Sequence, residues 1–82
     1  MTTEERKQRI AIGCEIIAKS AVHRKYKERL MLLRGMTPQK ITSTLRKIVA
    51  YIIDNPNADL GRVYAGAFGL TINGTKVPNV IS

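Results

Sequence analysis

The side chains that could do chemistry in this sequence are basic, and they are concentrated in one segment. Residues 19–47 contain nine lysines and arginines but one carboxylate, Glu28, so this segment has a formal net charge of +8. The flanking segments 1–18 and 48–82 each have no net charge. The nine basic residues are Lys19, Arg24, Lys25, Lys27, Arg29, Arg34, Lys40, Arg46 and Lys47. Such a block attracts polyanions, and it predicts contacts with phosphate groups.

Two helical stretches must position these cations. On residues 38–54, Lys40, Ser43 and Lys47 lie opposite the apolar positions, with Gln39 and Arg46 to one side. Hydroxyl, amide and cationic side chains together suit phosphate contacts. On residues 22–34, Arg24, Lys27 and Arg34 border the apolar stripe on one side, and Lys25 and Arg29 border it on the other. The alternative is that these long side chains merely cover the edge of the core.

Residues able to act as acids, bases or nucleophiles are few. His23 has no carboxylate placed nearby in the sequence to orient its ring, so we expect a surface residue without a catalytic role. Cys14 shares an apolar stripe with Ile10 and Ile17, which predicts a buried structural thiol and not a nucleophile. No phosphate-loop, dinucleotide or metal-ligand pattern occurs. The sequence therefore predicts a non-enzymatic protein with no catalytic residue, metal or cofactor.

Length and composition exclude several classes of protein. Eighty-two residues predict a single small domain, 1–82, whose core is aliphatic because aromatic residues are only 5% of the chain. The longest apolar run, residues 48–53, is far shorter than the roughly 20 residues of a membrane span. The charged start, MTTEERKQRI, lacks the apolar region of a signal peptide, and one cysteine cannot form an internal disulfide. We expect an intracellular, cytoplasmic protein.

The first part of the chain has helical periodicity, but its apolar stripe moves. Thr2 and Glu5 have the spacing of a capping box, so a helix should begin at about residue 3. One stripe comprises Ile10, Cys14, Ile17 and Ala21, and a second comprises Val22, Tyr26, Leu30 and Leu33. The second lies roughly 140° around the axis from the first. Either one long or bent helix reaches about residue 34, or the chain breaks near residues 19–20. We favour the single helix, because no strong helix breaker occurs at residue 20.

The remaining elements have clearer boundaries. Gly35 suits the end of a helix, and Thr37 and Pro38 suit the start of the next, over residues 38–54. Its apolar face comprises Ile41, Leu45, Ile48, Val49, Ile52 and Ile53. Asn57 is expected to cap a short helix, about 58–68, whose glycines would admit another helix closely. Asn73-Gly74 between β-prone residues indicates a hairpin.

These elements define a mainly α fold. We expect two or three long amphipathic helices, one short helix, and a C-terminal β-hairpin or extended tail. Apolar side chains on nearly every side of residues 30–33 exceed what one chain can bury, so we expect a homodimer.

The function that the charge favours is binding of nucleic acid, DNA in preference to RNA, through phosphate contacts of residues 19–47. The protein would act as a small regulator or accessory factor. The alternative is an adaptor or inhibitor that docks on an acidic surface of another protein. Solvent exposure of Tyr26, Leu30 and Met31 would favour that alternative.

Overall fold

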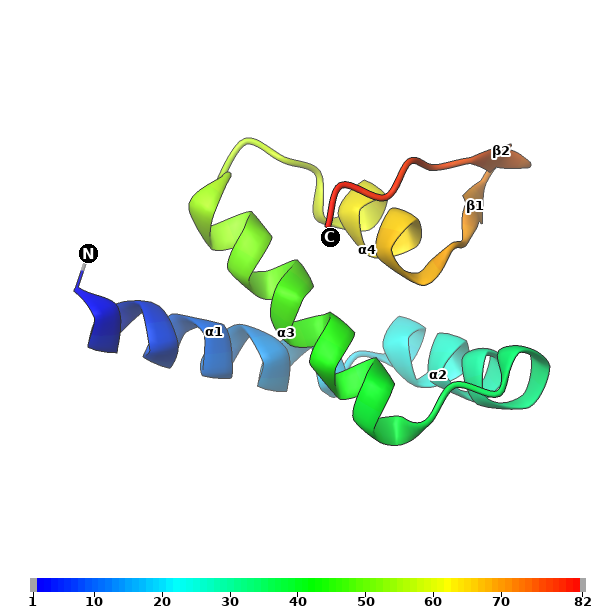
Figure 1. Ribbon diagram of the computed structural model, residues 1–82, viewed down its shortest axis with the longest axis horizontal. Helices are drawn as coiled ribbons and strands as arrows, with labels where there is room; N and C mark the ends of the chain where they lie inside the picture. The colour runs from blue at the N-terminus through cyan, green and yellow to red at the C-terminus, as the bar shows by residue number, and fades with distance from the viewer. Residues whose placement is uncertain (1, 82) are drawn as a thin grey trace.

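The computed structural model describes residues 2–81, and within that range it contains four helices and one short hairpin (Figure 1). The predicted mainly α fold with a C-terminal hairpin is confirmed. The helices are α1 (Thr3–Ala18), α2 (Ala21–Arg34), α3 (Pro38–Asp54) and α4 (Leu60–Phe68), and the strands are β1 (Thr71–Ile72) and β2 (Thr75–Lys76). Helix α3 crosses α1 and also packs on α4, and β1 follows α4 closely.

The expectation of one continuous helix over residues 3–34 is wrong. Ser20 has an extended backbone and separates α1 from α2. Its hydroxyl oxygen accepts a hydrogen bond from the His23 amide at 3.1 Å and donates one to the Ile17 carbonyl at 2.8 Å. An N-cap of this kind stabilises a helix start by about 1 kcal/mol. The move of the apolar stripe therefore marks a change of helix and not a second face of one helix.

The other helix ends follow local hydrogen bonding. Thr2 caps α1, Thr37 caps α3, and Gly35 ends α2 with a positive φ of 63°, as predicted. The prediction that Asn57 caps the short helix is wrong. Asp59 is the N-cap of α4, because its carboxylate accepts from the Gly61 amide at 3.1 Å. Pro56 and Asn57 therefore lie in a turn that precedes α4.

The hairpin has the predicted turn. Asn73 and Gly74 both have positive φ, 51° and 77°, which matches the twist of a two-residue hairpin loop. The two strands pair Thr71 with Lys76 and Ile72 with Thr75.

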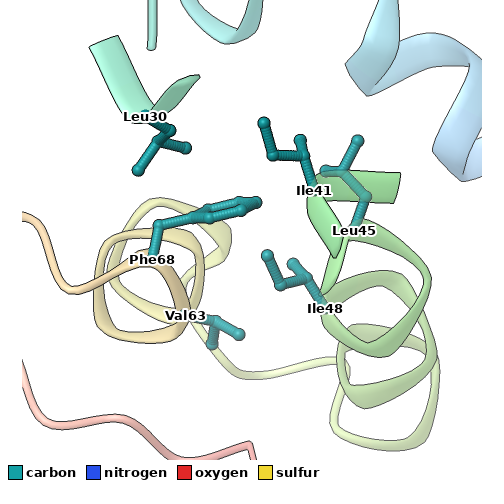
Figure 2. Packing of buried hydrophobic residues seen from close by; sticks show 6 residues of the cluster. All are labelled: Leu30, Ile41, Leu45, Ile48, Val63 and Phe68. Atoms are coloured by element: carbon teal, nitrogen blue, oxygen red, sulfur yellow. The ribbon is translucent and has the colours of Figure 1, made fainter. Parts of the chain in front are cut away.

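The core lies between α2, α3 and α4. Figure 2 shows its six buried side chains pointing toward one another. They are Leu30, Ile41, Leu45, Ile48, Val63 and Phe68. Of the predicted α3 face, Ile52 and Ile53 are half-buried and the other four are buried. Burial of a Leu, Ile or Val side chain contributes about 1.5–3 kcal/mol, so α3 is the main support of the fold.

A glycine in α4 admits the C-terminal tail and not another helix. A Cβ atom at Gly66 would overlap the carbonyl oxygen of Pro78. The tail therefore passes directly over α4 (Figure 1). On the other side of the molecule, Arg6 of α1 donates to Asp54 at the end of α3, at 2.8 Å, in an exposed ion pair. Exposed pairs contribute at most about 1 kcal/mol.

Candidate nucleic-acid interface

All nine basic residues of segment 19–47 are exposed. None takes part in an ion pair within residues 2–81, where the one pair present joins Arg6 to Asp54. The segment's positive charge is therefore not neutralised by the protein itself. Lys19 lies at the junction of α1 and α2, five others lie on α2, and three lie on α3.

Helix α2 carries cations along both flanks. At 100° per residue, Arg24 and Lys27 follow one flank, and Lys25 and Arg29 follow the other. Lys27 follows His23 by about one helical turn, and its positive charge helps to lower the pKa of His23. The two flanks point in different directions, so one flat ligand cannot contact all of these cations.

Arg34 differs from the other eight basic residues because its guanidinium is bound to the protein. Its Nη1 donates to the Phe68 carbonyl at 2.7 Å, and its Nη2 donates to the Gly69 carbonyl at 2.8 Å. These carbonyls are at the C-terminal end of α4, where a helix has unpaired acceptors and partial negative charge. Arg34 therefore joins the last turn of α2 to the end of α4.

Helix α3 presents its cations on two sides of an exposed ridge. Lys40 and Lys47 are aligned, as the helical pattern predicts, and both line a small depression with Ala67 and the tail residues Asn79 and Ile81. Arg46 lies on the other side and lines a shallow polar face with Gln39, Thr42 and Ser43. No carboxylate occurs in α3 before its last residue, Asp54. The outer surface of α3 is therefore polar and positive from Gln39 to Lys47.

The prediction that His23 is a surface residue is wrong. Its side chain is buried, and its Nδ1 lies 2.8 Å from the hydroxyl oxygen of Tyr64 in α4. Burial lowers the pKa of His23, and the positive charge of Lys27 lowers it further. Burial also raises the pKa of Tyr64 to about 12, with a smaller contribution from Tyr26. A neutral imidazole and a protonated phenol therefore form an internal hydrogen bond between α2 and α4.

An apolar groove was not predicted from the sequence. It has a volume of about 480 Å³ and lies where the end of α1, the start of α2, the start of α4 and β1 meet. Exposed apolar side chains line it: Ile16, Val22, Leu60 and Ile72. Because these come from four elements, the sequence signalled the groove only through parts of the two apolar stripes, Ile17 from the first and Val22 and Tyr26 from the second.

The three residues whose exposure would favour a protein-docking surface differ in how exposed they are. Leu30 is in the core at 1% exposure, Tyr26 is half-buried, and Met31 is 39% exposed. The neighbouring Leu32 and Leu33 are instead 83% and 81% exposed. The exposed apolar surface of this segment is therefore displaced toward the C-terminal turn of α2.

The remaining candidates for chemistry are isolated. Cys14 is half-buried. Burial raises the pKa of its thiol, and the positive charge of Arg46 lowers it by a smaller amount. Within residues 2–81, no three histidine, cysteine, aspartate or glutamate side chains come together as metal ligands. No helix in the same range is both long enough and apolar enough to cross a membrane.

Comparisons of this chain with protein-family models, curated proteins and solved structures give no match.

Proposed function

We propose that this protein binds duplex DNA without catalysis, through phosphate contacts of α2 and α3. The observation that carries the proposal is the set of eight exposed basic side chains in residues 19–47 that have no carboxylate partner in the described chain. Unpaired, solvated cations can exchange water and counterions for phosphate at low cost. Arg34 is excluded from this set, since it is bound to the end of α4.

Helix α3 is the element best suited to lie in a groove of the duplex. Ser43 is exposed on its outer side, and this short side chain lets the helix axis approach closely. Lys40 and Lys47 on one side, and Arg46 on the other, would then face the phosphates of the two strands. The major groove of B-DNA is about 12 Å wide and admits a helix. The major groove of RNA duplexes is too narrow, which favours DNA.

Such a protein would serve as a small regulator or accessory factor whose affinity comes mainly from the phosphate backbone. The second candidate function is docking on an acidic surface of another protein. Leu32 and Leu33 favour it, because they combine apolar exposure with neighbouring cations. A pull-down from nuclease-treated lysate distinguishes the two, since only a protein partner survives the treatment.

A gel-shift series at increasing salt tests the proposal, with random duplex DNA beside single-stranded DNA and duplex RNA. If each chain contacts five or six phosphates, log affinity falls with log salt at a slope of roughly −5 per chain. Duplex DNA should bind most tightly. Absence of binding at low salt, or binding that does not respond to salt, would contradict the proposal.

A further inference from the structure

The chain exposes more surface than a compact monomer of its size. Its accessible surface is 5848 Å² for a mass of 9.1 kDa. The usual scaling for folded monomers gives about 4,900 Å². The excess, roughly 900 Å², is similar to the ~800 Å² that each partner buries in a standard protein interface. Four large apolar side chains are each more than 60% exposed: Ile16, Val22, Leu32 and Leu33.

Four side chains on α2 form a continuous stripe beside the core-facing side of the helix, and Tyr26, half-buried against Tyr64, is the innermost of them. Val22, Tyr26, Arg29 and Leu33 lie within an arc of about 60°. Val22 and Tyr26 line the apolar groove, and Leu33 extends from the last turn of the same helix. Leu32, equally exposed, lies about 90° away from the centre of this stripe. The stripe therefore has an apolar groove at one end and a protruding leucine at the other.

We propose that this stripe is the interface of a homodimer in which the two α2 helices pack antiparallel about a twofold axis. In this arrangement Leu33 of one copy packs on Val22 of the other, at the mouth of the groove that Ile16 and Leu60 extend. Arg29 of one copy lies over the ring of Tyr26 of the other. One antiparallel register allows both the Leu33–Val22 pair and the Arg29–Tyr26 pair, because the midpoint of each pair lies between residues 27 and 28. The stripe is thus complementary to itself, as a twofold interface requires.

The charge of the interface sets its response to salt. Arg29 gains a cation–π contact with Tyr26, worth about 0.5–1 kcal/mol where the site is exposed. Lys25 and Arg29 of the two copies repel one another across the axis, and salt screens that repulsion. Dimerisation is therefore strengthened by salt, whereas binding to DNA is weakened by it. This inference does not rest on the proposed function, because the dimer forms without nucleic acid.

Sedimentation of the full chain over micromolar to millimolar concentrations, without nucleic acid, tests the dimer. The wild type should dimerise, and Leu33→Asp should raise the dimer dissociation constant by roughly a hundredfold because two carboxylates lose water on association. Leu32→Asp is the matched control, with the same charge change at the same exposure, and should have little effect. A monomeric wild type, or equal effects of the two variants, would overturn the proposal.

Disulfide cross-linking tests the register in a Cys14→Ala background. A mixture of chains that carry either Val22→Cys or Leu33→Cys should form a heterodimeric disulfide. Leu33→Cys alone should cross-link poorly, since eleven residues of helix separate the two equivalent positions by about 16 Å. Efficient cross-linking of Leu33→Cys alone, or none in the mixture, would exclude this antiparallel register.

Discussion

A buried histidine and a charged arginine each join α2 to α4. Within residues 2–81, His23 is the one buried polar residue, and its hydrogen bond to Tyr64 joins the first turn of α2 to the middle of α4. Arg34 makes a second polar link, from the last turn of α2 to the end of α4. Between them Leu30 enters the core. Helix α2 is thus attached at both ends and at one point between them, which leaves its outer flanks free.

The histidine predicts a dependence of stability on pH. Its pKa in the folded protein is lower than the value of 6.5 for an exposed imidazole, so folding favours the neutral ring. The stability that it contributes is complete above pH 6.5, and it is lost as the pH falls from 6.5 through the folded pKa. Urea unfolding at a series of pH values should therefore show the free energy of unfolding decreasing below pH 6.5.

The control for this effect is His23→Gln, which keeps a polar side chain but cannot titrate. Its free energy of unfolding should be lower than that of the wild type at neutral pH. It should also decrease less than that of the wild type as the pH falls below 6.5. Asp54 does not interfere, because Arg6 holds its pKa below the ordinary value of 3.8. If the variant keeps the wild-type slope between neutral pH and pH 5, another group is responsible.

At the scale of elements, the sequence predicts those boundaries that local chemistry determines strongly. Helix α3 was predicted with its observed bounds, because Thr37 and Pro38 start it, Pro56 ends it, and its apolar face has one unbroken period. The break between α1 and α2 was the alternative that we did not favour, because one serine hydroxyl decides it. The start of α4 was misplaced for a similar reason, since Asn57 and Asp59 are both acceptable caps.

The sequence predicted the candidate site in part: the exposure of its basic side chains, but not the contacts between distant segments. Exposure of the basic side chains follows from the helical pattern, and all nine are exposed. The partners of His23 and Arg34 were not predictable, because they lie 41 and more than 30 residues away along the chain. The apolar groove was missed because four elements build it. Packing between distant segments has no local pattern, so sequence periodicity cannot locate it.

The alignment of cations on α3 gives a prediction for DNA binding. Lys40→Ala with Lys47→Ala should weaken binding to all duplexes alike and reduce the magnitude of the salt slope by about two, one for each lost phosphate contact. Circular dichroism should be unchanged, since both side chains are exposed. The control, Lys7→Ala with Arg9→Ala, removes the same charge from α1 and should change the slope much less. An equal loss in the control would show that net charge alone governs binding.

At the scale of the whole molecule, the two proposals assign separate roles to the basic and the apolar surfaces. The cations proposed to contact phosphate lie on α3 and on the Arg24 and Lys27 flank of α2, and the proposed dimer stripe is on another side of α2. A twofold dimer would therefore leave both α3 ridges uncovered while it buries the stripe of Val22, Tyr26, Arg29 and Leu33. In the proposed dimer, Arg29 contacts Tyr26 of the other copy and is no longer counted among the proposed phosphate contacts. Two copies of the α3 surface in fixed relation could bind one duplex at two places.

This arrangement predicts how a monomeric variant binds DNA. If both chains of the dimer contact one duplex, the wild-type salt slope is about twice the single-chain value of roughly −5. Leu33→Asp removes the dimer contact but none of the phosphate-facing cations, so its slope should be about half that of the wild type. Leu32→Asp should keep the wild-type slope, because it adds the same charge but stays dimeric. Gel shifts of the three proteins on one long duplex, across a salt series, measure the ratio. Equal slopes for the wild type and a monomeric Leu33→Asp would mean that one chain of each dimer binds the duplex and that the second α3 ridge faces away from it.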